Sequence, residues 1–198
     1  MTYVALGRDI RTTDNAKSEE FFEKANAMAN EVFKLDLQFG NEALKISPQF
    51  SAAYNYGKGL AQGGLDAAHE AYVRGDYVIA LGEYMLIAEL GLPEAQAGLA
   101  KMYLKGHGVQ QDYIEAMMWY RKAAEQGDAY AQNSLGFMYE NALGVSQDIT
   151  RAYMWYSIAI SSGYSEARRY RDAVARKMSS SQIDYAHKLA YEWMMKYQ

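Results

Sequence analysis

The chain has 198 residues, of which 50% are hydrophobic, and 20 Lys and Arg against 24 Asp and Glu give a formal net charge of −4. This length suits one domain or two small ones and is sufficient to bury a core. The absence of cysteine excludes a disulfide scaffold, a thiolate metal site and a cysteine nucleophile, while 18 Tyr, 11 Met, 6 Phe and 3 Trp make the chain rich in aromatic and sulfur-containing side chains.

The N-terminal residues carry no pattern of a secretion signal. The apolar stretch from Tyr3 to Leu6 ends at Gly7, whereas a secretory signal needs an apolar region of roughly 7–15 residues. No run approaches the ~20 apolar residues of a membrane span. We therefore expect a cytoplasmic protein, or a periplasmic or secreted one if a leader has been removed, with residues 1–14 frayed.

Residues 15–64 are predicted to form an N-terminal helical cap. Apolar side chains recur at helical spacing in its first part, which indicates one or two amphipathic helices over residues 15–46. The stripe consists of Phe21, Phe22, Ala25, Met28, Ala29 and Val32.

A repeat with an offset of 36 residues dominates the middle of the chain. We place a degenerate unit at residues 65–92 and two full units at residues 93–127 and 128–163, each predicted as a helix, a turn and a second helix. The paired positions include Ala95 and Ala131, Gln96 and Gln132, Leu99 and Leu135, Met102 and Met138, Tyr103 and Tyr139, Trp119 and Trp155, and Tyr120 and Tyr156.

Glycine and aspartate mark the turns within the units. Gly106 and Gly108 supply positions where φ can be positive, so that the first helix ends. Asp112 is predicted to cap the second helix, with Glu115 completing a capping box. In the next unit Ala142 replaces the first turn glycine, which predicts a looser turn.

Residues 164–198 are predicted to form C-terminal capping helices. Arg168 and Arg171 stand where the repeat has Gln132 and Leu135, as a polar cap requires. Ser179 then begins a capping box before the last helix. That helix should lie across the end of the stack through Ile183, Ala186, Ala190 and Trp193.

The motifs A-x-A-Q-x-x-L-G-x-x-Y, G-x-G-V-x-Q-D-Y-x-x-A and W-Y-x-x-A-A-x-x-G resemble the Sel1-like repeat, a relative of the tetratricopeptide repeat. Ala100 departs from the usual glycine. Residues 43–54 also resemble a junction between two tetratricopeptide repeats. The resemblance implies an all-α fold, a right-handed α-solenoid of antiparallel helix pairs with helical caps.

No catalytic, cofactor-binding or metal-binding residue is predicted. His69, His107 and His187 lie apart in the sequence, and no phosphate loop, dinucleotide fingerprint or G-x-S-x-G motif is present. Residues 65–164 carry 6 basic and 12 acidic side chains, which opposes nucleic-acid binding. Residues 165–198 carry 7 basic and 4 acidic side chains, which suit either a solvated cap or the attraction of an acidic partner.

Candidate partner-binding residues follow from the resemblance, because the first helices of tetratricopeptide-type stacks line a concave groove. The positions off the apolar stripe are Glu94, Ala97, Gly98, Lys101, Lys105, Tyr130, Asn133, Ser134, Phe137, Glu140 and Asn141. Tyr130 and Phe137 stand out as aromatic anchors among polar neighbours. The alternative is that both pack against an adjacent helix.

The resemblance implies a non-catalytic adaptor that binds a peptide or helix of a protein partner, in bacterial signalling, envelope or host-interaction regulation. An alternative is a hydrolase-like or β-lactam-binding activity, as in cysteine-rich relatives, although cysteine and a Ser-x-x-Lys motif are both missing. Self-association through an exposed repeat edge is a third possibility.

Overall fold

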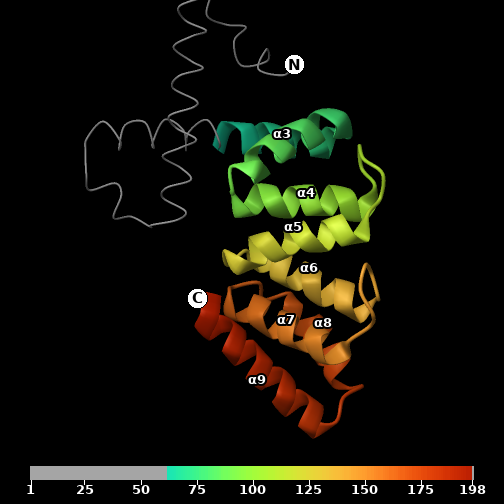
Figure 1. Cartoon of the computed structure of the whole chain (residues 1–198), viewed down its shortest axis with the longest axis vertical. Helices are drawn as coiled ribbons and strands as arrows, with labels where there is room; N and C mark the ends of the chain where they lie inside the picture. Colours follow the sequence, from blue (N-terminus) through green and yellow to red (C-terminus); the bar gives the residue numbers. More distant parts are fainter. Residues whose placement is uncertain (1–61, 198) are drawn as a thin grey trace, which may run out of the picture. The chain divides into compact units, whose positions relative to one another are not determined.

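The computed structural model describes residues 62–197, and these form a stack of helices without a strand (Figure 1). The predicted all-α solenoid is confirmed in this part of the chain. The expectations for residues 1–14, 15–46 and 43–54 lie outside the described residues. After a helix over residues 62–74 come α3 (Tyr77–Glu89), α4 (Pro93–Lys105), α5 (Tyr113–Glu125), α6 (Ala129–Glu140), α7 (Ile149–Ser161), α8 (Ala167–Ala175) and α9 (Ser180–Tyr197).

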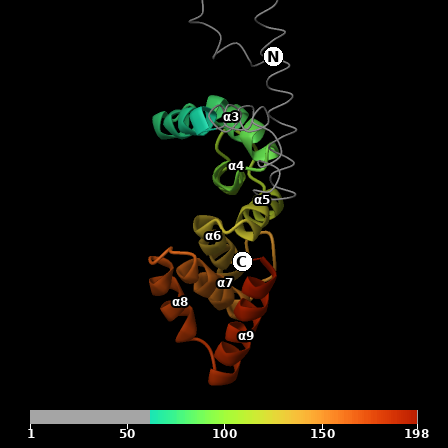
Figure 2. The same ribbon diagram turned by 90° about the vertical axis from the view of Figure 1, so that its left-hand side faces the viewer.

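Helices that follow each other in the sequence pack side by side from α3 to α7. Figure 2 shows α4, α6 and α8 toward the left of the stack and α5 and α9 toward the right. The last two helices break the simple alternation, because α7 packs against both α8 and α9. The predicted apolar face of α9 therefore covers α7, with Ala186 and Ala190 buried.

The core alternates small and aromatic side chains. Tyr120 and Tyr156 are fully buried, and so are Ala116 and Ala152 one helical turn before them. A Cβ on Gly136 would lie 2.6 Å from the Tyr156 ring, so the small residue is what lets the ring approach the α6 backbone. Stripe aromatics thus fill the space that small residues leave, as the sequence predicts.

A buried glutamine joins each unit to the one before it. The Gln96 side-chain amide donates to the Ala88 carbonyl at 3.3 Å, and Gln132 makes the same contact with Ala124 at 3.3 Å. These carbonyls lie in the last turn of the preceding helix, where each also accepts from a turn amide, that of Gly91 or Gly127, at 3.0 Å. The contact gives a physical reason for glutamine at this repeat position.

The predicted helix caps are present, with one difference. The Asp112 carboxylate accepts hydrogen bonds from the amides of Ile114 and Glu115 at 2.8 and 3.0 Å. The Asp112 amide, however, donates to the Tyr103 carbonyl at 3.0 Å, so the Glu115 side chain does not complete a capping box. The predicted box of Ser179 and Gln182 is confirmed, with the Ser179 amide donating to Gln182 Oε1 at 2.9 Å.

The prediction of a looser second turn is wrong. Ala142 adopts φ +55°, close to the +69° of Gly106. The amide of Leu143 donates to Met138 as that of His107 donates to Met102, each at 3.0 Å. The two turns therefore share one conformation, and alanine adopts a left-handed backbone that costs non-glycine residues free energy.

Ala142→Gly is expected to raise the free energy of unfolding by about 0.5 kcal/mol, because the gain from relieved strain exceeds the added freedom of the unfolded chain. Urea denaturation followed by circular dichroism measures this as a higher midpoint. A lower midpoint would show that the left-handed alanine is unstrained.

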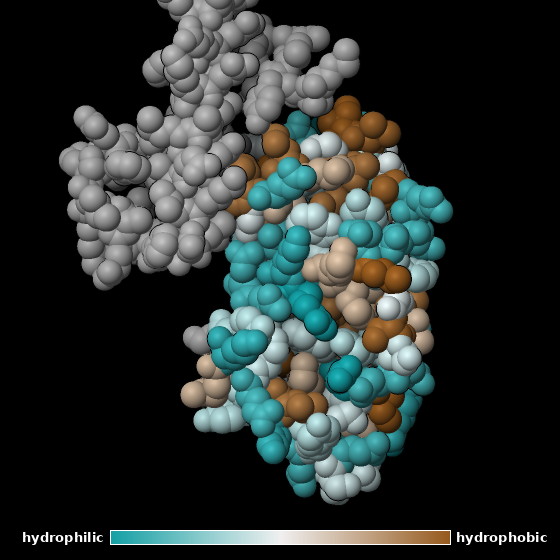
Figure 3. Space-filling view, in the orientation of Figure 1, coloured by the Kyte–Doolittle hydropathy of each residue, from teal (hydrophilic) through white to brown (hydrophobic). Residues whose placement is uncertain are grey.

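The outer face of α3 carries exposed apolar side chains. Val78 and Ile79 are both exposed, as are Met85 and Leu86, and Figure 3 shows hydrophobic residues gathered at this end of the described part. This is the kind of repeat edge to which the self-association hypothesis refers. Self-association itself stays a prediction.

Candidate partner-binding surface

Helix α6 presents two aromatic side chains to solvent. Tyr130 is 37% exposed and Phe137 is 42% exposed. Seven residues, about two helical turns, separate them, so they lie on the same side of the helix. Leu135 and Met138 on the other side are fully buried.

Asn133 lies between the two aromatic residues, one turn from each. Its Oδ1 atom is buried and has no hydrogen-bond partner among the described residues. A buried acceptor without a donor costs about 1–3 kcal/mol. Tyr130, Asn133 and Phe137 together are called the α6 surface below.

Tyr130 is held by other tyrosines, whereas no such ring contact holds Phe137 among the described residues. The Tyr130 ring lies edge-on to Tyr120 and to Tyr164, with centroids 6.2 and 6.3 Å apart. Tyr130 thus satisfies both sequence interpretations, since one part of its ring packs and another part faces solvent. Phe137 fits the anchor interpretation better.

The positions equivalent to the α6 surface in the neighbouring first helices show whether the fold requires aromatic residues there. In α4 these positions hold Glu94, Ala97 and Lys101, and at α8 they hold Arg169 and Ala173 within the helix and Glu166 just before it. Because neighbouring first helices fold with polar or small residues there, helix packing does not require the aromatic pair of α6.

Two of the predicted contact residues are buried, and the ring of a neighbouring helix lies against a third. Ala97 and Ser134 are only 4% and 6% exposed, and a Cβ on Gly98 would lie 2.4 Å from the Tyr84 ring. The Ser134 hydroxyl donates to the Tyr130 carbonyl at 2.9 Å. Ala97 and Ser134 therefore support the helix and offer little surface to a partner, whereas Gly98 is only half-buried.

Two further candidates are engaged within the stack. Glu140 accepts a hydrogen bond from the Tyr156 hydroxyl at 2.8 Å and lies 3.9 Å from the Lys177 ammonium. The Asn141 side-chain amide donates to the Phe137 carbonyl at 2.8 Å and so caps α6. Both serve the end of this helix.

The remaining candidates are charged residues of α4. Glu94 and Lys105 are exposed. The Lys101 ammonium lies 4.4 Å from the centroid of the Tyr72 ring, a cation–π contact with the helix over residues 62–74. These three residues can contribute charge at the rim of a contact centred on the α6 surface.

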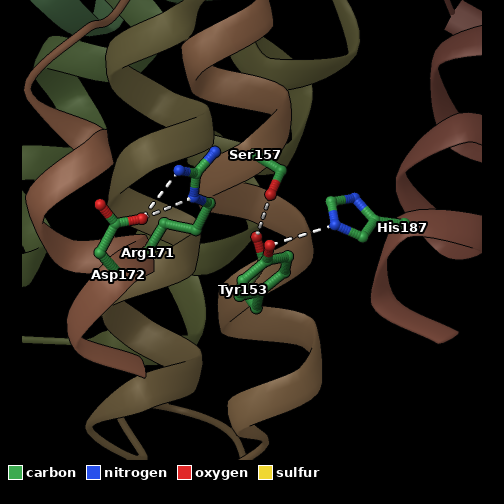
Figure 4. A network of polar contacts seen from close by, with 5 residues as sticks. All are labelled: Tyr153, Ser157, Arg171, Asp172 and His187. Atoms are coloured by element: carbon green, nitrogen blue, oxygen red, sulfur yellow. Dashed lines mark hydrogen bonds and ion pairs between the residues drawn. The ribbon is translucent and has the colours of Figure 1, made fainter. Parts of the chain in front are cut away.

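The histidines take part in packing. His107 stacks on Tyr77, with centroids 4.2 Å apart, and its Nδ1 lies 3.1 Å from the Tyr72 hydroxyl. His187 on α9 lies 3.2 Å from the Tyr153 hydroxyl, as Figure 4 shows. Within residues 62–197 no group of three histidine or carboxylate side chains could hold a metal ion.

Figure 4 also shows two contacts that each stay within one helix, beside the Tyr153–His187 contact that joins α7 to α9. Ser157 donates to the Tyr153 carbonyl at 2.9 Å within α7, and Arg171 pairs with Asp172 at 2.8 Å on α8. The Arg171 guanidinium lies 6.0 Å from the Tyr153 ring centroid. Tyr153 therefore meets α8 on one side and α9 on the other.

One concave region was not anticipated from the sequence. It is a cleft between α5, α6, α7 and α9 that contains two arginines, Arg121 and Arg151. The sequence does contain a signal for it, because neither arginine recurs in the repeat. The positions 36 residues before Arg121 and Arg151 hold Met85 and Glu115. Within the described helices, none is long and apolar enough to cross a membrane.

The family model for the Sel1 repeat matches residues 93–128 and 129–164. A protective antigen present in uropathogenic Escherichia coli strains, displaying an SLR fold, is 24% identical with a TM-score of 0.67. The alignment covers 89% of this chain and only 39% of the antigen. A Sel1 repeat protein from Oxalobacter formigenes is 36% identical over 59% of this chain and 94% of its own, with a TM-score of 0.49. No curated protein matches.

Proposed function

Since this chain is a Sel1-like repeat protein with two Sel1 repeats, we propose that it is a non-catalytic scaffold that binds a peptide or helix of a protein partner on the α6 surface. Sel1 repeat proteins generally act as protein-interaction scaffolds. To this general role the proposal adds the surface on which the partner binds and the side chains that contact it.

The exposed aromatic pair of α6 is the observation that carries the proposal. Aromatic side chains at the centre of an interface supply much of its binding free energy. Tyr130 and Phe137 are exposed at positions where the neighbouring first helices carry no aromatic residue. They are therefore available as anchors for apolar side chains of a partner.

Asn133 suits the backbone of a bound peptide. A side-chain amide has one carbonyl acceptor and two N–H donors, the same groups that a peptide bond carries. Its Oδ1 is buried and has no donor among the described residues, so a turn of this half-buried side chain toward a peptide N–H would relieve an existing cost. Anchors on both sides of this amide would fix the peptide's register.

The charged rim supports orientation of the partner. Glu94 and Lys105 stand near opposite ends of α4 and differ in sign. Exposed charges of this kind contribute little to affinity but favour one direction of approach.

We propose a bacterial setting in the cytoplasm, in signalling, envelope or host-interaction regulation.

The test is affinity capture from native lysate with the Tyr130→Ala/Phe137→Ala double variant. Loss of both anchors is expected to lower the captured partner at least about tenfold, with the helicity by circular dichroism unchanged. The Tyr185→Ala/Tyr191→Ala variant is the matched control, because it removes two exposed rings from α9. Equal capture by the wild type and the α6 variant would contradict the proposal.

A further inference from the structure

The cleft between α5, α6, α7 and α9 is a feature that the α6 surface does not explain. It is open to solvent and has a volume of about 400 Å³, within the range of sites that hold small ligands or single side chains. Its lining includes Arg121 and Glu125 from α5, Tyr139 from α6, Arg151 and Trp155 from α7, and Trp193 from α9.

Aromatic rings form a firm apolar wall of this cleft. Tyr139 and Trp155 are buried. The Trp155 and Trp193 rings meet edge to face, with centroids 5.1 Å apart and planes at 66°. Trp193 in turn lies against Tyr197, with centroids 4.9 Å apart. Rings that are already held in place by their neighbours lose little conformational entropy when a ligand binds.

Two guanidinium groups converge on the same tyrosine. Arg121 Nη2 donates to the Tyr139 hydroxyl at 3.4 Å, and Arg151 Cζ lies 5.7 Å from the centroid of the Tyr139 ring. In the described part of the chain, no carboxylate lies within 4.0 Å of the Arg121 guanidinium. Arg121 thus retains most of its five N–H donors for a ligand.

Arg151 is also available for a ligand, because its ion pair is weak. Its guanidinium lies 3.5 Å from the Asp148 carboxylate, and both side chains are more than a third exposed. Exposed pairs of this kind contribute about 0–1 kcal/mol. A ligand carboxylate in the cleft can therefore compete for this guanidinium.

The preceding repeat shows which cleft residues the fold requires. The aromatic positions recur there, with Tyr103 in place of Tyr139 and Trp119 in place of Trp155. The arginine positions do not recur, since they hold Met85 and Glu115. The stack therefore needs the rings, whereas the two positive charges are an addition at this one interface.

We propose that this cleft binds a carboxylate of a partner peptide together with an aromatic side chain beside it. The guanidinium groups pair with the carboxylate, which matches their planar donors, and the ligand ring lies against Trp155 and Trp193. Glu125, the one carboxylate side chain in the lining, repels a doubly charged phosphate about twice as strongly as a singly charged carboxylate. This second site goes beyond the α6 surface and gives the scaffold two contacts.

The test uses N-acetylphenylalanine as the probe and the full chain labelled with ¹⁵N. The indole N–H signals of Trp155 and Trp193 are expected to shift with a Kd on the order of 1 mM. The Trp119 signal serves as the internal reference because that ring lies outside the cleft lining. N-acetylphenylalanine amide, which lacks the carboxylate, and N-acetylglycine, which lacks the ring, are expected to bind at least about tenfold more weakly.

The variants are chosen from the preceding repeat, where the fold carries the same residues. Arg121→Met and Arg151→Glu are each expected to weaken N-acetylphenylalanine binding at least about tenfold, whereas Arg168→Gln on α8, an exposed arginine outside the cleft, should leave it unchanged. Phe137→Ala should also leave it unchanged, which separates this site from the α6 surface. Equal binding of the amide, equal binding of inorganic phosphate, or unchanged binding by Arg121→Met would overturn the proposal.

Discussion

Tyr156→Ala is expected to lower the free energy of unfolding by about 4 kcal/mol, as large-to-small changes of core aromatics do. Tyr156 is fully buried, its ring stacks on Tyr170 with centroids 5.6 Å apart, and its other side lies against Gly136. Alanine would leave a cavity where α6, α7 and α8 meet. Urea denaturation of the full chain measures the loss.

One further variant separates the contribution of the ring from that of the hydroxyl, and a second variant serves as the control. Tyr156→Phe keeps the ring and removes only the hydrogen bond to Glu140, so it is expected to cost about 1 kcal/mol. Burial and, next, the bond to Glu140 raise the pKa of the Tyr156 hydroxyl, which keeps it protonated as a donor. Tyr191→Ala, at an exposed ring of α9, should cost less than about 0.5 kcal/mol. A loss for Tyr156→Ala no larger than that of Tyr191→Ala would show that ring packing does not hold the stack.

Gly144→Ala is expected to cost about 3 kcal/mol, because the new Cβ meets both an unfavourable backbone and a close neighbour. Gly144 has φ +70°, and a Cβ there would lie 2.7 Å from the carbonyl oxygen of Tyr113. A backbone atom cannot turn away as a flexible side chain can. The turn would have to shift away from the start of α5.

Gly127→Ala is the matched control for this prediction. Gly127 has a similar φ of +88°, but a Cβ there would meet nothing within 4 Å. It is expected to cost about 1 kcal/mol, from backbone strain alone. The same urea denaturation measures both variants. Equal losses in the free energy of unfolding would show that the close contact between Gly144 and the Tyr113 carbonyl does not limit the turn.

The helices of the two full units could be predicted from the sequence because their signals are local. Asp112 caps α5 as expected, and Gly163 adopts the left-handed conformation just after α7. The conformation of Ala142 could not be predicted in the same way. Its φ of +55° is imposed by the contacts of the whole turn, which outweigh the preference of the residue itself.

The candidate surface was predicted only in part, because a helical pattern describes one helix at a time. Tyr130 and Phe137 are exposed as the pattern indicates. Gly98 lies off the apolar stripe of α4, yet the ring of Tyr84 from the preceding unit covers it. Burial of that kind depends on the next layer of the solenoid, which the periodicity of α4 does not contain.

The arginine cleft shows a second limit of pattern reading. Arg121 and Arg151 come from different helices and meet through Tyr139 on a third, and α9 contributes Trp193. No spacing in the sequence brings these four together. Comparison of the units is more informative. Positions that carry the same type of residue in each unit are needed for packing, whereas positions where the residue type changes are available for binding.

Photocrosslinking at the α6 surface tests the central claim most directly. With p-benzoylphenylalanine in place of Phe137, we expect a partner protein to be crosslinked in native lysate. With the same group in place of Tyr185, an exposed residue of α9 about two turns before the cleft residue Trp193, no such product is expected. Equal products from both positions, or a product from Tyr185 alone, would contradict the claim that partners bind on the α6 surface.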